Sequence, residues 1–284
     1  MELLEMKKKR FYLPYLLSVI MMITLAGPQT AQTKEFNSNN VTVGSNAIYW
    51  RTERNHIGML AAYSVVYKGW QTNNSRGYNI GSVLLSNDSL VNGRLVFWAR
   101  NCNTITHNET QHGEVRLMLG YLAQLNSDRK HGKIVPDIKN LDGYTVYTTL
   151  EPCAQCSGMM TLQKVRRTIY GQSDPGFGKA LERLQLNSTA LPNGYTPYPR
   201  KVISERSNII YCDLLEQAYK KAGPDVHITD FLKSEEAKQI FERAYHEFRN
   251  YQAQVPSING QFLEEARQLV ESVPQNFVPL SPDI

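Results

Sequence analysis

Two short motifs about 40 residues apart constrain this chain of 284 residues most strongly. His112-Gly113-Glu114 opens one helical pattern, and Pro152-Cys153-Ala154-Gln155-Cys156 opens another, directly after a strand-like run. Thiolate and imidazole are ligands that zinc prefers in a tetrahedral site. The two motifs therefore supply three zinc ligands, His112, Cys153 and Cys156, and one further carboxylate, Glu114.

The spacing of these residues suits a catalytic zinc ion. Cysteines three positions apart lie on the first turn of one helix, where free N–H groups and the helix dipole favour thiolate over thiol. Three protein ligands leave the fourth position for a water, whose pKa zinc lowers to about 7. Glu114 then serves as proton shuttle, and the zinc-bound hydroxide as nucleophile. The sequence thus predicts one zinc ion per chain in a hydrolytic site.

Two other interpretations of the same residues stay open. Cys153 and Cys156 could form a disulfide, with His112 as an unrelated surface histidine. A zinc ion held by the three residues could also be purely structural. The combination of both motifs, each at the start of a helix, favours the catalytic zinc.

Hydrophobic periodicity predicts an α/β protein, because strands and helices alternate along the middle of the chain. The predicted elements are a helix over Ile48–Val66, a hairpin of strands Tyr78–Leu85 and Arg94–Ala99, a helix through Val115 and Leu125, a strand at Thr145–Thr149, a helix from Cys153 and a strand at Arg167–Gly171.

The remaining segments fall outside this alternation. A basic, turn-rich loop is expected at Asn126–Gly143, and an insertion or crossing loop at Leu186–Ser207. Ser234 is a plausible N-cap for a C-terminal helix, because two glutamates follow in the first turn. Apolar stripes through Phe241 and Phe262 predict that these aromatic residues pack in the core, against the sheet layer.

One stretch of sequence also resembles a known family. The run from Thr148 to Met160 leads through Leu-Glu-Pro into the two cysteines, Arg-Thr-Ile-Tyr-Gly follows at 167–171, and Ser-Asp-Pro-Gly-Phe-Gly at 173–178. This text resembles the zinc-dependent cytidine and deoxycytidylate deaminase superfamily, and it is most similar to the tRNA adenosine deaminase and guanine deaminase branch. The resemblance covers roughly Tyr78 to Leu184. It implies a three-layer α/β/α fold around a mixed five-stranded sheet, with N-terminal and C-terminal helical extensions added here.

The resemblance also implies roles for individual residues. The family places a substrate-binding asparagine before the zinc histidine. Asn101 stands at the matching distance, and Asn103 is a nearby rival. Thr110 matches a threonine of the family, whereas Gly113 stands where alanine is more frequent. The implied activity is hydrolytic deamination of a nucleobase, nucleoside or nucleotide. Relatives are often dimers or larger, so the resemblance leaves a homo-oligomer open, and no interface can be read from the sequence.

The sequence predicts four regions. Residues 1–31 carry a basic cluster followed by an apolar run, which is typical of a cleaved signal peptide or an uncleaved N-terminal anchor. Residues 45–77 form an N-terminal helical extension and 78–185 the zinc deaminase core. Residues 186–284 comprise the turn-rich insertion and a helical region. An exported protein, periplasmic or secreted, is therefore expected.

Export and the additional regions motivate one alternative function, a secreted effector or toxin that deaminates nucleic acid or protein. A non-enzymatic binding module stabilised by zinc is a further alternative. The formal net charge of +5 is too mild to indicate nucleic-acid binding by itself. Two small basic groups occur, and a solvated surface is the commoner explanation for them. They are Lys164, Arg166 and Arg167, and Arg129, Lys130, His131 and Lys133.

Two cysteines stand outside the motifs. Cys102 and Cys212 could form a disulfide in an oxidising compartment, or they could be separately buried thiols.

Overall fold

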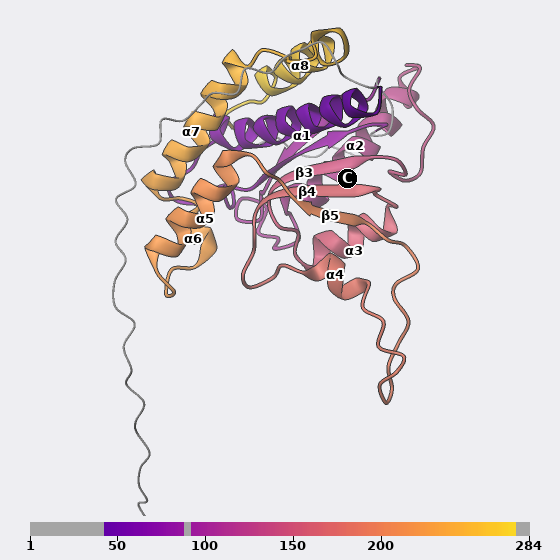
Figure 1. The fold of residues 1–284 in the computed structure, drawn as a ribbon, viewed down its shortest axis with the longest axis vertical. Coiled ribbons are helices and arrows are strands. Elements are labelled where there is room, and N and C mark those ends of the chain that lie inside the picture. The colour runs from indigo at the N-terminus through magenta and orange to yellow at the C-terminus, as the bar shows by residue number, and fades with distance from the viewer. Residues whose placement is uncertain (1–42, 88–91, 277–284) are drawn as a thin grey trace, which may run out of the picture. The chain divides into compact units, whose positions relative to one another are not determined.

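The computed structural model describes residues 43–87 and 92–276, with side chains from residue 49 onward. Within these ranges, strands and helices alternate as far as the fifth strand, and four helices follow it (Figure 1). The elements are α1 (Val43–Lys68), β1 (Gly81–Leu85), β2 (Leu95–Arg100), α2 (Gly113–Lys130), β3 (Thr145–Leu150), α3 (Ala154–Leu162), β4 (Arg167–Gln172), α4 (Ala180–Leu184), β5 (Ile203–Arg206), α5 (Ile210–Ala222), α6 (Ile228–Phe231), α7 (Glu235–Asn250) and α8 (Pro256–Glu271).

The five strands form one mixed sheet in the order β2-β1-β3-β4-β5. The β1–β2 hairpin is antiparallel, as the sequence predicts, and β1 also pairs antiparallel with β3. The pairs β3–β4 and β4–β5 are parallel. Parallel neighbours need a crossover connection, and α3 and α4 lie in these two crossovers. The mixed five-stranded sheet is confirmed.

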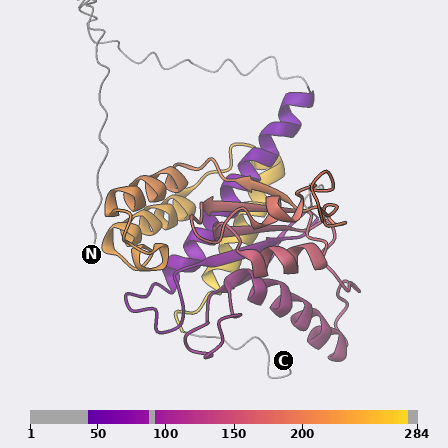
Figure 2. The same cartoon turned by 90° about the horizontal axis from the view of Figure 1, so that it is seen from below.

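Helices cover both faces of this sheet, which gives the expected three layers. α1 packs on the central strands, with α5 beside it on β4, whereas α2 lies on the opposite face against β1 and β2. Each face has its own apolar core, one centred on α1 and the other on α2 (Figures 1 and 2). The metal-ligand motifs belong to the second face, because α2 and α3 follow them directly.

The C-terminal helices form an outer cover on α1. The Phe241 ring of α7 lies 4.8 Å from the ring of Tyr63 and 5.4 Å from that of Trp70, measured between centroids. The prediction that the C-terminal aromatic residues are core residues is confirmed, since Phe241, Phe248 and Phe262 are buried. Their main neighbour is α1 rather than the sheet itself.

Two segments differ from the sequence-based expectation. α2 continues to Lys130, so the loop expected from Asn126 begins at His131. Asn126, Ser127 and Asp128 are weak helix formers, but Arg129 donates a hydrogen bond of 2.9 Å to Asn126 Oδ1 inside the last turn. The second difference is β5, which lies in the stretch expected to be an insertion or crossing loop, beyond the 78–185 range assigned to the core.

Ser234 caps α7 as expected, since its hydroxyl accepts a 3.2 Å hydrogen bond from the N–H of Ala237. Cys102 and Cys212 are free, buried thiols rather than a disulfide.

The signal peptide or anchor expected at residues 1–31 lies outside the described residues. Among the helices of the described ranges, none has both the length and the apolar character needed to cross a bilayer.

Candidate metal centre and substrate cavity

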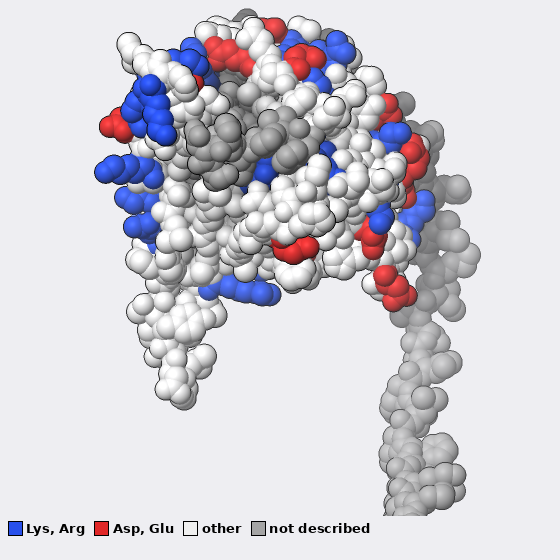
Figure 3. Space-filling view, turned by 180° about the vertical axis from the view of Figure 1, so that it is seen from behind, with Lys and Arg blue, Asp and Glu red and all other residues white. Residues whose placement is uncertain are grey.

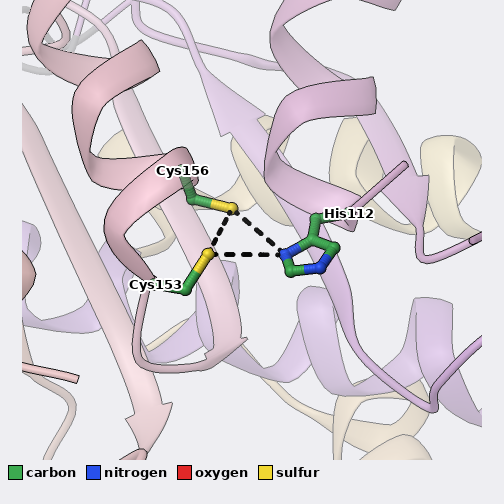
Figure 4. A group of neighbouring side chains, drawn as sticks. All are labelled: His112, Cys153 and Cys156. Atoms are coloured by element: carbon green, nitrogen blue, oxygen red, sulfur yellow. Dashed lines mark hydrogen bonds between the residues drawn. The ribbon is translucent and has the colours of Figure 1, made fainter. Parts of the chain in front are cut away.

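His112, Cys153 and Cys156 converge on one point (Figure 4). The Cys153 Sγ lies 3.5 Å from the Nδ1 of His112, and the Cys156 Sγ lies 3.6 Å from the same nitrogen. The two sulfur atoms are 3.6 Å apart. A tetrahedral zinc ion with its usual bond lengths would separate such ligand atoms by about 3.5–3.8 Å. The three residues therefore fit a zinc ion.

Both helices that carry these residues begin in the same way. His112 is the N-cap residue of α2 and Cys153 that of α3; each has an extended backbone, and neither side chain caps its helix. An N-cap side chain usually accepts a hydrogen bond from the first turn. Here the two side chains point to the shared centre instead, so two helix N-termini face one another across it (Figure 4).

The cysteines are poised for a cation. The hydrogen bond shared with Cys156, with a further contribution from His112, lowers the pKa of the Cys153 thiol to about 4. The same bond to Cys153, together with burial, raises the pKa of Cys156 well above its usual range. Two adjacent thiolates repel, whereas a bound metal ion deprotonates coordinating thiols outright. The two charges of a zinc ion would balance both thiolates.

Glu114 lies beside this centre in the first turn of α2. Its Oε1 accepts a 3.0 Å hydrogen bond from the hydroxyl of Thr148, and its Oε2 lies 3.5 Å from the Cys156 Sγ. The residue is buried, and burial raises the pKa of the carboxyl. A carboxyl group held this way can exchange protons with a molecule bound in front of it.

Asn101 follows β2 and is fully buried. Its Oδ1 accepts a 2.6 Å hydrogen bond from the N–H of Gly113, which replaces the missing cap of α2. Its Nδ2 has no hydrogen-bond partner among the described residues. Asn103, the rival, instead donates a 3.4 Å hydrogen bond to Glu109. Of the two asparagines, Asn101 is the one that lines the cavity described next.

A cavity of about 470 Å³ opens in front of the centre. This volume is in the range that small-molecule sites occupy. It brings together the predicted residues His112, Glu114, Cys153 and Asn101. The other lining residues are Tyr78, Ile80, Glu109, Leu150, Glu151, Ala154, Gln155, Asp174, Phe177, His227, Ile228 and Thr229.

Glu151 and Asp174 shape the cavity by holding a loop. Glu151 accepts hydrogen bonds from the N–H groups of Asp174, at 3.1 Å, and Lys179, at 3.0 Å. Asp174 Oδ1 accepts from the N–H of Phe177 at 2.9 Å. These bonds set Phe177 at the rim, where its ring is largely exposed. Both acidic residues lie in the stretches that resemble the deaminase family, but nothing in the sequence indicated that they hold a loop.

The rim residues His227, Ile228 and Thr229 were missed from the sequence. They lie at the start of α6, more than 70 residues after the zinc cysteines, and no motif marks them. His227 Nδ1 lies 2.8 Å from the Thr229 hydroxyl oxygen. The C-terminal helical region therefore contributes part of the wall, in addition to covering α1.

Comparison with known proteins agrees with this geometry. Residues 53–172 match the family described as the cytidine and deoxycytidylate deaminase zinc-binding region. The match contains the three candidate ligands and Glu114. It begins within α1, earlier than the resemblance at Tyr78 indicated.

Two of the relatives share less than a third of their residues with this chain where the sequences align. The chain is 29% identical over 99 residues to a tRNA-specific adenosine deaminase of Bacillus subtilis, covering 35% of this chain and 52% of that protein. It is 26% identical over 157 residues to tRNA-specific adenosine deaminase 2 of Xenopus laevis, covering 55% and 86%. The chain thus spans about half the length of the Bacillus relative.

The guanine deaminase structure from Bacillus subtilis is 17% identical with a TM-score of 0.32, covering 60% of this chain and 96% of that one.

Proposed function

We propose that this protein is a zinc-dependent hydrolytic deaminase of a nucleobase, free or within a nucleoside or nucleotide, because residues 53–172 match the cytidine and deoxycytidylate deaminase zinc-binding region. One observation carries the proposal. Three zinc-type ligand atoms lie 3.5–3.6 Å apart, with the buried Glu114 carboxyl next to them and an open cavity in front. A purely structural zinc site would have no use for that carboxyl.

Different residues of this chain would bind the metal and transfer the protons. His112, Cys153 and Cys156 would hold the zinc ion, which when bound supplies a water of lowered pKa. Glu114 takes a proton from the attacking water and passes it to the ring nitrogen of the base. Thr148 fixes Oε1 of Glu114, so Oε2 is the oxygen that exchanges protons. A Cys156 thiolate would no longer donate to Oε2, which leaves that oxygen available.

The reaction balances with water as the second reactant. The water oxygen bonds to the ring carbon that carries the amino group, and the ring nitrogen gains the proton from Glu114. Glu114 then takes the proton of the hydroxyl group formed on this carbon and delivers it to the amino nitrogen. The bond from the carbon to that nitrogen breaks, and a carbonyl group remains on the ring. One water is consumed and one ammonia is released. Asn101 Nδ2 is available to hold the base in the cavity meanwhile.

Ammonia release by the zinc-loaded protein tests this function. The panel contains cytidine, deoxycytidine, adenosine, guanine, tRNA and single-stranded DNA. We expect release from at least one substrate, and a loss of about 10²–10⁴-fold in Glu114→Ala with unchanged zinc content, because a proton shuttle contributes about that much. Full activity in Glu114→Ala would show the mechanism to be wrong.

A further inference from the structure

A second hollow adjoins the candidate site. It has a volume of about 500 Å³ and shares two lining residues, Ala154 and Phe177, with the first cavity. Ala154 directly follows the ligand Cys153, so the two hollows meet next to the metal centre. A molecule that places one group at the centre can therefore extend into the second hollow. Its other lining residues are Gly176, Ala180, Arg183, Leu184, Tyr195, Thr196, Pro197, Tyr198 and Pro199.

The far wall of this hollow is a projecting loop, residues 185–200, which lies beyond the family match. Hydrogen bonds across its base anchor it. The N–H of Tyr198 donates to the carbonyl of Leu184 at 2.8 Å, and the N–H of Ser188 to that of Tyr195 at 3.0 Å. Tyr195 also donates from its N–H to the Ser188 hydroxyl at 2.9 Å. The two tyrosines are thus presented from a fixed backbone.

Three aromatic rings at this hollow are exposed. Phe177 has 63% of its surface accessible, Tyr195 has 60% and Tyr198 has 41%. Apolar surface gathered at one place usually marks a binding site. Exposed flat rings in a hollow can stack on other flat groups. Every nucleobase offers such a face, so stacking does not depend on the nucleotide sequence.

Charge around the hollow favours an anionic ligand. Residues 185–199 contain no charged side chain, and Arg183 is the one charged residue among those that line the hollow in the described chain. Arg200, the last residue of the loop, and Lys201, which follows it, are exposed, and the basic residues Lys164 and Arg166 are exposed as well. Figure 3 shows the loop as a white projection, with blue side chains along the edge of the molecule above it.

Hydrogen bonds to backbone carbonyl groups join the segments that carry these basic residues into one patch. Arg200 donates a 2.8 Å hydrogen bond to the carbonyl of Leu162, at the end of α3. The N–H of Ile203 donates to the carbonyl of Arg166 at 3.1 Å. The segment that carries Arg200 and Lys201 therefore runs beside the turn that carries Lys164 and Arg166. The sequence alone showed only half of this patch.

We propose that the second hollow holds the nucleotide next to the deaminated base, so that the substrate is a single-stranded polynucleotide. This proposal rests on the proposed function for its orientation. The target base occupies the metal cavity, and the neighbouring base stacks on Phe177, Tyr195 and Tyr198. The phosphate between them lies near Arg183, and the strand continues over the basic patch. A single strand fits better than a duplex because only unpaired bases present free faces.

The first test is binding of the zinc-loaded full-length protein to fluorescein-labelled single-stranded RNA and DNA of about 12 nucleotides, by fluorescence anisotropy. The double variant Tyr195→Ala/Tyr198→Ala should raise Kd by about tenfold or more. Tyr195→Phe/Tyr198→Phe should bind like the wild type, because stacking needs the ring and not the hydroxyl. Normal binding of this variant would show that the ring, and not the hydroxyl, makes the contact.

A salt titration tests the charge. Arg183→Gln should reduce the slope of log Kd against log salt by about one, as expected for one phosphate contact. Lys220→Gln, an exposed lysine on α5 at the opposite side of the sheet, is the matched control and should leave the slope unchanged (Figure 1).

The outcomes for the groove and for the function are distinguishable. The protein could deaminate free nucleosides while oligonucleotide binding is absent or unaffected by the tyrosine and arginine variants. This result overturns the role of the second hollow and leaves the proposed function intact. Oligonucleotide binding that depends on the tyrosines and on salt, without ammonia release from any substrate, supports the second hollow as a nucleotide site and contradicts the proposed deaminase activity. Equal affinity for single-stranded and duplex oligonucleotides would also overturn the stacking assignment.

Discussion

At the scale of single residues, the candidate site uses two N-cap positions for metal binding. His112 and Cys153 take backbone positions that serine or aspartate usually occupies, and neither caps its helix. Asn101 compensates at α2 by accepting from the N–H of Gly113. The same side chain keeps its Nδ2 free of partners among the described residues. One asparagine therefore links the start of a ligand-bearing helix to the substrate cavity.

Replacement of Asn101 tests this double role. Asn101→Ala removes the acceptor for the N–H of Gly113 and the donor to the base, so kcat/KM should fall by roughly 10–100-fold, equivalent to about 1–3 kcal/mol. Asn103→Ala is the matched control, since Asn103 is also buried but does not line the cavity, and it should stay within about twofold of the wild type. Equal losses in steady-state kinetics of both variants would contradict the assignment.

Cys212 predicts a pH dependence of stability away from the site. Burial raises the pKa of its thiol from 9.0 to about 11, and its sulfur accepts a 3.5 Å hydrogen bond from Tyr63. A thiol whose folded pKa is raised stabilises the fold fully below pH 9 and loses that contribution as the pH rises toward 11. The free energy of unfolding should therefore decline between these values more steeply in the wild type than in Cys212→Ala. Parallel declines in urea titrations would refute this.

At the scale of elements, periodicity predicted the strands that carry their own apolar pattern. β1 and β3 are buried along their whole length, and both were expected. β5 was missed because its four residues alternate between exposed and half-buried at the edge of the sheet. Its pairing depends on the backbone of β4, which no local pattern reveals. The start of α6 was missed as part of the cavity wall for the same reason: only the tertiary fold brings it there.

The docking of α8 on α1 depends on one buried carboxylate. Glu53 of α1 accepts hydrogen bonds from the N–H groups of Gln254 and Val255 and from Asn259 Nδ2, the last at 2.7 Å. Val255 is the N-cap residue of α8 and offers no side-chain cap of its own. A carboxylate at a helix N-terminus also interacts favourably with the helix dipole. Glu53 therefore caps α8 from a different helix.

Glu53→Gln should destabilise the protein by about 2–3 kcal/mol, because the buried N–H groups lose a charged acceptor. Glu236→Gln, at the exposed first turn of α7, is the control and should change the free energy of unfolding by less than about 0.5 kcal/mol. Chemical denaturation measures both. A loss in Glu53→Gln no larger than in the control would show that α8 docks through its apolar face alone.

At the scale of the whole molecule, the two faces of the sheet have separate tasks. One face holds α2 and α3 with the metal-binding residues, and the other supports α1 and its cover of C-terminal helices. The ligands and Glu114 could be named from the sequence because each motif is local to one helix start. The cavity could not, since its wall combines the segment before β1, the loop after β4 and the start of α6.

The central claim is that three residues hold zinc while a fourth moves protons, and paired measurement of zinc content and ammonia release tests it most directly. Wild type, Cys153→Ser and Glu114→Gln are compared on the most active substrate. We predict one zinc ion per chain and ammonia release in the wild type, loss of both in Cys153→Ser, and retained zinc without ammonia release in Glu114→Gln. Activity in a zinc-free Cys153→Ser protein, or undiminished activity in Glu114→Gln, would contradict the assignment.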